Sequence, residues 1–240
     1  MEPKCNYCDF FGEKYHCHNC KIFNKARTHT PQEIDCSLEE LVEYINSNEV
    51  IMERFGVGDY KTIELYTGEQ IKIILIDIDK DTLADGSGKA RATFGVFYMD
   101  GSYEMNPTNT NEGGWCESKM RTVYMERIFK LLPKVLRDNI KPVVKKTSAG
   151  NRSSEIVCTT DKLFAFSEIE LLGERNYSFA GEGELYEYFG FEQNRNFRRY
   201  LWLRSPGYNS SVTFCYVSNN GSVYYSIASY SSGVAFGFCI

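Results

Sequence analysis

The sequence is poor in histidine, proline and long apolar runs, and it has no excess of basic residues. Its 240 residues include three histidines and six prolines, and the formal net charge is −5 at pH 7. A protein that binds nucleic acid needs clustered lysine and arginine to contact phosphates. The acidic balance therefore argues against nucleic acid as the main partner. The most apolar segment, residues 71–78, has the length of a strand and is too short to span a membrane.

Histidine is absent beyond the N-terminal region. The three histidines are His16, His18 and His29. Catalytic triads and Cys–His pairs need an imidazole beside the nucleophile, and none is available near the C-terminus. We therefore expect that the protein is not an enzyme. The N-terminus also lacks the apolar run of a signal peptide, so we expect a cytoplasmic or virion-associated protein.

The nine cysteines need another explanation than disulfides, which are rare in proteins without a secretory signal. Four of them form two CxxC pairs: Cys5, Cys8, Cys17 and Cys20. Four thiolates at this spacing suit tetrahedral Zn²⁺, and His16 or His18 could replace one of them. A redox role for the two pairs is the weaker alternative, because neither pair lies between a strand and a helix. We predict a zinc-binding module over residues 1–30, with the metal in a structural role because so short a segment cannot bury enough core alone.

Periodicity predicts an α+β protein. Ser37 and Glu40 form a capping box that opens a helix over residues 37–46, inside a helical linker at 31–60. A second helix is expected around residues 120–131, where Pro133 interrupts it, and residues 167–170 are expected to form a short turn or the start of a helix. Strands are expected at residues 61–67, 71–77, 90–99, 156–160, 163–166, 202–206, 212–217, 222–227 and 234–240.

Two charged segments are interpreted as exposed to solvent. The basic stretch 134–146 is diluted by apolar residues and is expected to be a solvated face. The acidic run Asp77, Asp79, Asp81 and Asp85 is similar to a Ca²⁺ loop but lacks the terminal bidentate glutamate. We therefore expect it to form the solvated end of a hairpin.

The last part of the chain contains no charged side chain. No Asp, Glu, Lys or Arg follows Arg204, and the segment is instead rich in Tyr, Ser, Asn and Gly. Antibody loops use the same residues, because tyrosine gives large contacts with few rotors and Ser and Asn adapt their hydrogen bonds. Lack of charge lowers the cost of desolvation on binding. The predicted ligand-binding residues are Tyr208, Asn209, Ser210, Ser211, Phe214, Ser218, Asn219, Tyr224, Tyr225, Ser226, Ser229, Tyr230 and Ser231.

Other residues of this segment are expected to be internal. Trp202 is expected to anchor the core, and Arg204 is expected to form an internal hydrogen-bond network. The apolar side chains assigned to the core are Val217, Val223, Val234, Phe236 and Phe238.

Motifs over residues 61–240 resemble a family of bacterial and phage domains that end in a WLRSP…YV…G…GVRPAF pattern. In chain order they are Gly114-Trp115, Ser118, Met120-Arg121, Leu132-Pro133, residues 160–164, Ser167 with Glu170, residues 202–206, Tyr216-Val217, Gly221 and Gly233-Val234. The resemblance implies a C-type lectin fold of the formylglycine-generating-enzyme-like branch. Several members are variable proteins of diversity-generating retroelements, in which reverse transcription errors at template adenines randomise codons near the C-terminus. This chain departs from the pattern at Ala235 and Phe236, where the family has Arg and Pro.

These observations lead to one function and two alternatives. We expect a non-catalytic protein that binds a protein or cell-surface ligand through residues 205–240 of a C-type-lectin-like domain at 61–240, with a retroelement diversifying that surface. The first alternative is a structural or assembly component of a phage particle. The second is a cysteine oxidase similar to the formylglycine-generating enzyme, for which Cys215 and Cys239 are candidates by position only.

Overall fold

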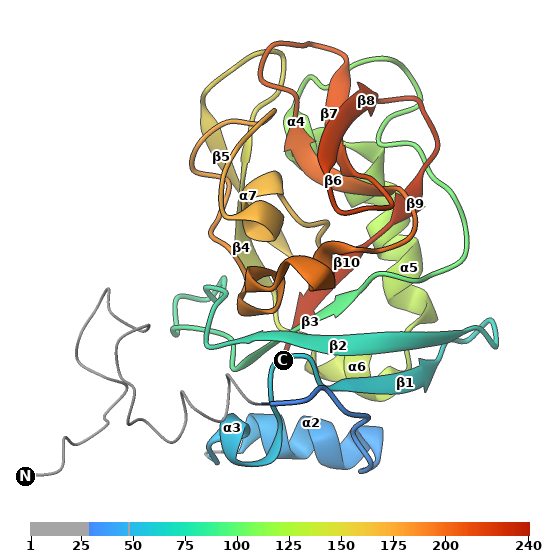
Figure 1. The fold of residues 1–240 in the computed structure, drawn as a ribbon, viewed down its shortest axis with the longest axis vertical. Helices are drawn as coiled ribbons and strands as arrows, with labels where there is room; N and C mark the ends of the chain where they lie inside the picture. The colour runs from blue at the N-terminus through green and yellow to red at the C-terminus, as the bar shows by residue number, and fades with distance from the viewer. Residues whose placement is uncertain (1–28, 48) are drawn as a thin grey trace, which may run out of the picture.

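Helices and sheets are mixed along the chain, as expected for an α+β protein, in the residues that this computed structural model describes, 29–47 and 49–240 (Figure 1). Their strands form one two-stranded and two four-stranded sheets. Within these ranges no helix is long and apolar enough to cross a membrane. The predicted zinc ligands Cys5, Cys8, Cys17 and Cys20 lie outside the described residues.

The first sheet has the order β1-β2-β3-β10 and lies in the lower half of Figure 1. Its strands are β1 (Tyr60–Glu64), β2 (Gln70–Ile78), β3 (Ala92–Val96) and β10 (Phe236–Cys239). The predicted hairpin is confirmed, because β1 and β2 pair antiparallel with Ile63 opposite Ile71. β10 pairs antiparallel with β3, so the C-terminal strand closes a sheet that begins near residue 60.

Two helices form a layer below this sheet, α2 (Leu38–Asn46) and α3 (Ile51–Arg54). The predicted capping box is confirmed. The Ser37 hydroxyl accepts a hydrogen bond from the Glu40 N–H at 3.1 Å, and the Glu40 carboxylate accepts one from the Ser37 N–H at 2.8 Å. This pairing satisfies two N–H groups that a helix start leaves open.

The middle of the chain supplies short helices and the second sheet. The helical elements are α4 (Gly114–Glu117), the π-helix η1 (Met120–Met125), α5 (Glu126–Leu131), α6 (Lys134–Asn139) and α7 (Glu168–Leu172). β4 (Val143–Ser148) and β5 (Ile156–Asp161) pair antiparallel. The predicted helix over 120–131 is present, and Pro133 separates α5 from α6. Strand β4 was not predicted, because part of it falls in the basic stretch interpreted as a solvated face.

The third sheet has the order β8-β7-β6-β9 and forms the upper part of the molecule (Figure 1). Its strands are β6 (Leu201–Pro206), β7 (Thr213–Val217), β8 (Val223–Ile227) and β9 (Gly233–Val234). Two 3₁₀ turns precede it, η2 (Glu187–Gly190) and η3 (Glu192–Arg195). β8 is the last strand at one side of this sheet.

The predicted final strand, 234–240, is in fact split between two sheets. β9 runs parallel to β6, and after the buried Ala235 the chain enters the first sheet as β10. The predicted strand at 163–166 is wrong. Phe164 only forms an isolated bridge with Gly237, with hydrogen bonds of 2.7 and 3.0 Å. Glycine is required there, because a Cβ on Gly237 would lie 2.6 Å from the Phe164 ring.

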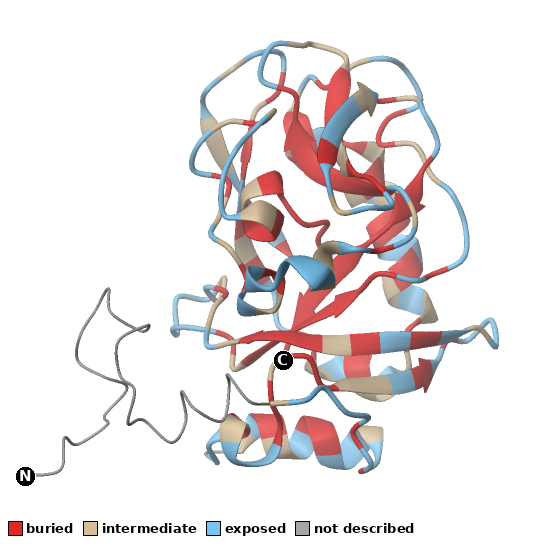
Figure 2. Cartoon of the chain, in the orientation of Figure 1, coloured by how far each residue is buried: buried red, intermediate tan, exposed pale blue. Residues whose placement is uncertain are grey.

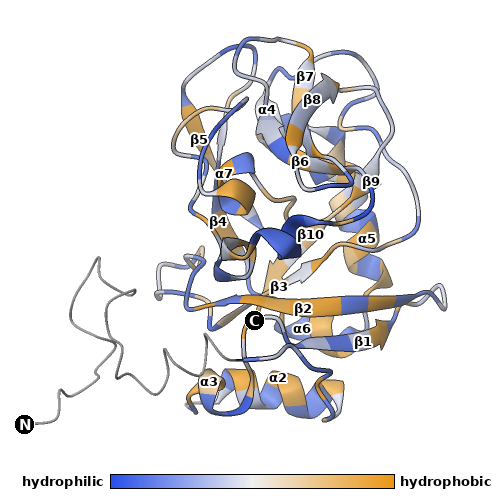
Figure 3. Ribbon diagram, in the orientation of Figure 1, coloured by the Kyte–Doolittle hydropathy of each residue, from blue (hydrophilic) through white to orange (hydrophobic). Residues whose placement is uncertain are grey.

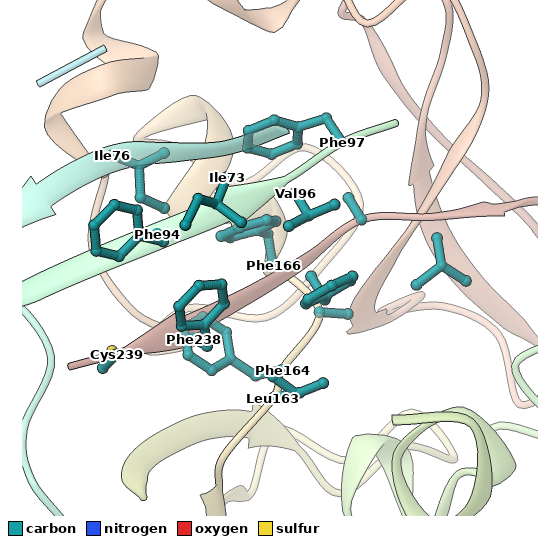
Figure 4. Packing of buried hydrophobic residues seen from close by; sticks show 14 of the residues in the cluster. Ile73, Ile76, Phe94, Val96, Phe97, Leu163, Phe164, Phe166, Phe238 and Cys239 are labelled. Atoms are coloured by element: carbon teal, nitrogen blue, oxygen red, sulfur yellow. The ribbon is translucent and has the colours of Figure 1, made fainter. Parts of the chain in front are cut away.

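Aromatic side chains fill the core between the first sheet and the elements above it (Figure 4). Phe97 contacts the rings of Phe166 and Phe189, and Phe94 stacks on Phe238 at 5.5 Å between centroids. The expected core positions in the C-terminal segment, from Trp202 to Phe238, are all buried. β2 is strongly hydrophobic, whereas β8 has intermediate hydropathy (Figure 3).

Candidate functional site

The third sheet places most of the predicted binding residues at the surface. β8 is largely exposed, in contrast to β6 and β7 (Figure 2). The exposed ones are Tyr208, Asn209, Asn219, Tyr224, Tyr225, Tyr230 and Ser231, and the half-buried ones are Ser210, Ser211, Ser226 and Ser229.

Two of the predicted binding residues do not lie at this surface. Phe214 is fully buried, because β7 runs between β8 and β6 and points this side chain into the core. Ser218 is buried as well, and its hydroxyl donates to the side-chain oxygen of Asn220 at 2.6 Å. Ser218 therefore stabilises the turn between β7 and β8 and is not free to contact a ligand.

Five tyrosines form a continuous row across the edge of the third sheet, which we call the tyrosine row. It consists of Tyr200, Tyr216, Tyr224, Tyr177 and Tyr225. Successive ring centroids are 5.7, 6.1, 6.4 and 5.2 Å apart in that order. These are the separations of aromatic rings in direct contact. Tyr200, Tyr224 and Tyr225 each keep about half of their area exposed, at 52%, 46% and 47%.

Three members of the row, Tyr200, Tyr216 and Tyr177, were not among the binding residues predicted from the sequence. Tyr200 lies just before residues 205–240, the predicted binding segment, and its ring contacts that of Tyr216. The alternation of Tyr200 with Trp202 along one strand face was a usable signal. Tyr177 comes from the loop after α7, and no local pattern predicts that it reaches β8.

Glu168 holds Tyr177 in this position. The Glu168 carboxylate is fully buried and accepts hydrogen bonds from the backbone N–H groups of Tyr177 and Ser178, at 3.0 and 2.8 Å. The Glu168 N–H donates in turn to the Ser205 hydroxyl on β6 at 3.0 Å. The loop that carries Tyr177 is thus tied to the sheet that carries the rest of the row.

A groove of about 640 Å³ lies beside the tyrosine row. One wall is the loop after α7, the other is the turn before β8 and the first part of that strand, and η3 contributes the remaining side. The lining residues that matter most are Tyr177, Tyr224, Glu174, Glu192 and Arg195. The segment without charge is therefore bordered by charged side chains from elsewhere in the chain.

Below the surface, the Arg204 guanidinium of β6 is completely buried. All of its nitrogens donate hydrogen bonds. The acceptors are Thr147 Oγ1 at 3.0 Å, the carbonyl oxygens of Ala165 at 2.8 Å, Glu182 at 2.9 Å and Lys146 at 3.2 Å, and both carboxylate oxygens of Glu170. This confirms the predicted internal network. Because the fork of donors is fully satisfied, the buried charge is compensated.

Lys145 of β4 joins the same network. Its ammonium lies 2.6 Å from Glu170 Oε1 and 2.8 Å from Asp81 Oδ1, and it donates to the Tyr186 hydroxyl at 2.8 Å. Burial raises the pKa of Asp81, but the charge of Lys145 together with the hydrogen bonds from Lys145, Thr93 and Tyr186 holds that pKa below its usual value. The solvated interpretation is wrong for Lys145 and for Asp77 and Asp81, which are all buried.

Glu182 is a second buried carboxyl close to Arg204. One of its oxygens accepts a hydrogen bond from the Ser148 N–H at 2.9 Å, and the other lacks a partner among the described residues. Burial raises the pKa of Glu182 to about 7, despite the nearby Ser205 hydroxyl, the Ser148 N–H and the charge of Arg204, which lower it. This carboxyl therefore changes charge near neutral pH.

The two cysteines considered for oxidase chemistry, Cys215 and Cys239, are both buried. Burial raises the pKa of each thiol well above its usual value, and neighbouring carboxylates raise it further. Reactive thiols are found in electropositive, partly exposed settings. Neither of these two cysteines has such a setting. Within residues 29–47 and 49–240, no group of three or more His, Cys, Asp or Glu side chains is placed to hold a metal ion.

A sequence family described as a domain of unknown function, DUF6273, matches residues 79–240. The chain belongs to the DUF6273 family. The DUF6273 region contains the whole buried network, from Asp81 to Arg204, together with the tyrosine row. No curated protein and no solved structure matches the chain.

We predict that Arg204→Met destabilises the protein by about 3–5 kcal/mol, because it leaves the Glu170 carboxylate buried without its main partner. Arg204→Lys should also be destabilising, since an ammonium cannot replace the planar fork of donors. Denaturant unfolding measures both. The control is Arg127→Met at an exposed arginine, which should change stability by less than about 0.5 kcal/mol. Equal effects at residues 204 and 127 would contradict the role of the network.

We predict that Glu182 makes stability depend on pH between about 4.5 and 7. The folded pKa is above the unfolded value of 4.5, so the folded protein binds more protons in this window. The contribution of Glu182 to the free energy of unfolding is therefore fully present below pH 4.5. It is lost as the pH rises through 7, which lowers the free energy of unfolding by roughly 3 kcal/mol in total. The measurement is the unfolding free energy of wild type minus that of Glu182→Gln across pH 4–8. If this difference in unfolding free energy does not change between pH 4 and 8, the pKa of Glu182 is not raised in the folded protein.

Proposed function

We propose that the protein is a non-catalytic binding protein that recognises a protein or cell-surface ligand through the tyrosine row and the Ser and Asn side chains around it. The observation that carries the proposal is the contact chain of five tyrosines that crosses the third sheet from the start of β6 to β8 and the loop after α7. Exposed aromatic side chains in one contiguous group are unusual on a surface without a partner. They are also the residues most enriched among binding hot spots.

The chemistry of the surroundings supports recognition more than catalysis. Tyrosine has few rotors and loses little entropy on binding, while Ser and Asn adjust their hydrogen bonds to different partners. The described residues place no histidine near the row, and the two cysteines beneath the sheet are buried with raised pKa values. Contact between surfaces therefore accounts for these residues better than bond breaking does.

The diversification of this surface by a retroelement is part of the proposal. A variable binding protein needs positions that tolerate change and a framework that does not depend on them. Trp202 and Arg204 of the WLRSP segment are buried. The tyrosines that follow this segment, Tyr208, Tyr224 and Tyr225, are exposed. This separation, together with the resemblance of residues 61–240 to variable proteins with a C-type lectin fold, supports it.

A structural zinc ion at Cys5, Cys8, Cys17 and Cys20 completes the proposed organisation. Elemental analysis of the purified full chain should find about one zinc per molecule, and Cys17→Ser with Cys20→Ser should abolish it. Cys158→Ser, at an exposed free cysteine, should leave the zinc content unchanged. A wild-type content below half an equivalent would count against the module.

The binding function is tested by applying the fluorescently labelled full chain to arrays of bacterial surface proteins and of glycans. We expect saturable binding to members of one class. The double variant Tyr224→Ser, Tyr225→Ser should weaken it at least tenfold, because two contacts of hot-spot size are lost, each worth about 2 kcal/mol. The matched control is Tyr66→Ser, at a tyrosine that is 63% exposed on another part of the molecule.

Two results would reject the binding function. One is the absence of saturable binding on both arrays. The other is binding that the double variant retains at the strength of wild type and of the Tyr66 control.

A further inference from the structure

The outer edge of β8 carries backbone groups that pair with no other described residue. Hydrogen-bonded positions alternate along an antiparallel pair, and the Ala228 N–H bonds Val212 while the Ser218 N–H bonds Ser222. Because Tyr216 lies opposite Tyr224 in the register, the backbone N–H and C=O groups of Tyr224 and Ser226 point toward β7. Those of Val223, Tyr225 and Ile227 face outward, and only the Ile227 carbonyl has a partner, the Tyr230 N–H.

The groove described above meets this same edge at the first residues of β8. Ser222, Val223 and Tyr224 of β8 line one wall, and the loop from Leu172 to Tyr177 lines the other. Its volume of about 640 Å³ lies within the usual range of ligand sites, about 300–1,000 Å³. An open strand edge and a groove beside it are independent observations, and together they describe a site for one extended chain.

The groove also carries a charge preference. Glu174 and Glu192 form no ion pair among the described residues, and Arg195 is held by a hydrogen bond from its Nε to the Phe189 carbonyl at 2.8 Å. Two carboxylates against one guanidinium leave the lining net negative. The complementary side chain is lysine or arginine, which can also stack on the faces of Tyr177 or Tyr224.

We propose that an extended peptide segment of a protein partner adds to β8 as a further strand and directs a lysine or arginine side chain toward Glu174 and Glu192. This assignment rests on the proposed binding function and narrows it to one partner class. Backbone hydrogen bonds to Val223, Tyr225 and Ile227 supply affinity, and the groove supplies selectivity for alternate side chains. The Tyr177 ring, 5.2 Å from that of Tyr225, offers an aromatic contact to the incoming strand.

A second copy of the chain does not fit as the occupant. The loop from Leu172 to Tyr177 lines the same groove as the start of β8, so a strand that approaches this edge meets the loop. The β8 edge of another copy would bring its own loop into the same space. The groove therefore selects a free segment of a partner.

The test starts from a phage-displayed library of random dodecapeptides selected on the immobilised full chain. Selected sequences are then made as free synthetic peptides and their binding is measured by calorimetry. The decisive comparison is Tyr225→Pro against Tyr225→Ala. Both remove the ring, but only proline removes the outward N–H, which β7 does not use, and proline is tolerated at such edge positions. We expect Tyr225→Pro to bind at least tenfold more weakly than Tyr225→Ala.

The charge preference has its own comparison. Glu174→Gln with Glu192→Gln should weaken peptides that carry lysine or arginine at least fivefold at low salt, with a smaller effect at high salt. A matched change at an exposed carboxylate far from the groove, Glu53→Gln, should leave binding unchanged. Equal weakening by both variants would contradict the groove as the site.

Amide hydrogen exchange measured by NMR gives a direct readout of strand addition. In the free protein the N–H groups of Tyr224 and Ser226 should exchange slowly, and those of Val223, Tyr225 and Ile227 should exchange fast. Bound peptide should slow the second set at least tenfold. Unchanged exchange at these three positions, or failure of the library to yield any specific peptide, overturns the proposal.

The outcomes separate the two proposals. If array ligands still depend on Tyr224 and Tyr225, but proline and alanine at residue 225 behave alike, the row binds its ligand through side chains and strand addition is wrong. If the tyrosine variants affect no ligand of any kind, the binding function itself fails.

Discussion

A buried ion network centred on Arg204 holds together the segments on which the candidate surface depends. The guanidinium belongs to β6, its carboxylate partner Glu170 belongs to α7, and Lys145 extends the network to β4 and Asp81. Removing charges from water is costly, and only a fully hydrogen-bonded arrangement offsets that cost. Since all these groups must be in place at once, the network specifies how the second and third sheets sit on the first.

This arrangement explains how one short segment can contain both a rigid interior and a permissive surface. β6 is buried along its whole length, whereas β8, two strands away, is mostly exposed. In the loop after α7, likewise, a buried group supports a surface residue: the Glu168 carboxylate binds the backbone N–H of Tyr177 and holds it in place. Side chains of the tyrosine row can then vary in contact chemistry without disturbing the charges beneath them, provided that β8 keeps its pairing with β7.

Local signals in the sequence predicted the features that depend on neighbouring residues. The capping box at Ser37 needs only residues three positions apart and forms as expected, and a second capping box forms at Ser167, where a short turn or a helix start was expected. The strands β6, β7 and β8 and the internal role of Arg204 were also predicted. Features that depend on distant partners were not. Lys145 and Asp81 are buried as an ion pair. Both were predicted to be exposed because each side chain is charged.

The candidate site shows the same division. Exposure of Tyr224 and Tyr225 followed from composition, but Phe214 was assigned to the surface although β7 is an interior strand. Tyr177 and the acidic side of the groove come from loops far away in the chain, which no periodicity connects to β8. The switch of the last strand from one sheet to another likewise depends on the approach of Phe164 to Gly237.

The central claim is that an invariant buried framework presents a surface that is free to change for recognition. The most direct measurement is the codon-by-codon distribution of differences among copies of this gene in closely related genomes. The account predicts that amino-acid differences concentrate at exposed positions between Tyr208 and Ser231 and spare Arg204, Glu170 and Lys145. Differences spread evenly over residues 61–240, or concentrated at the buried network, would contradict it.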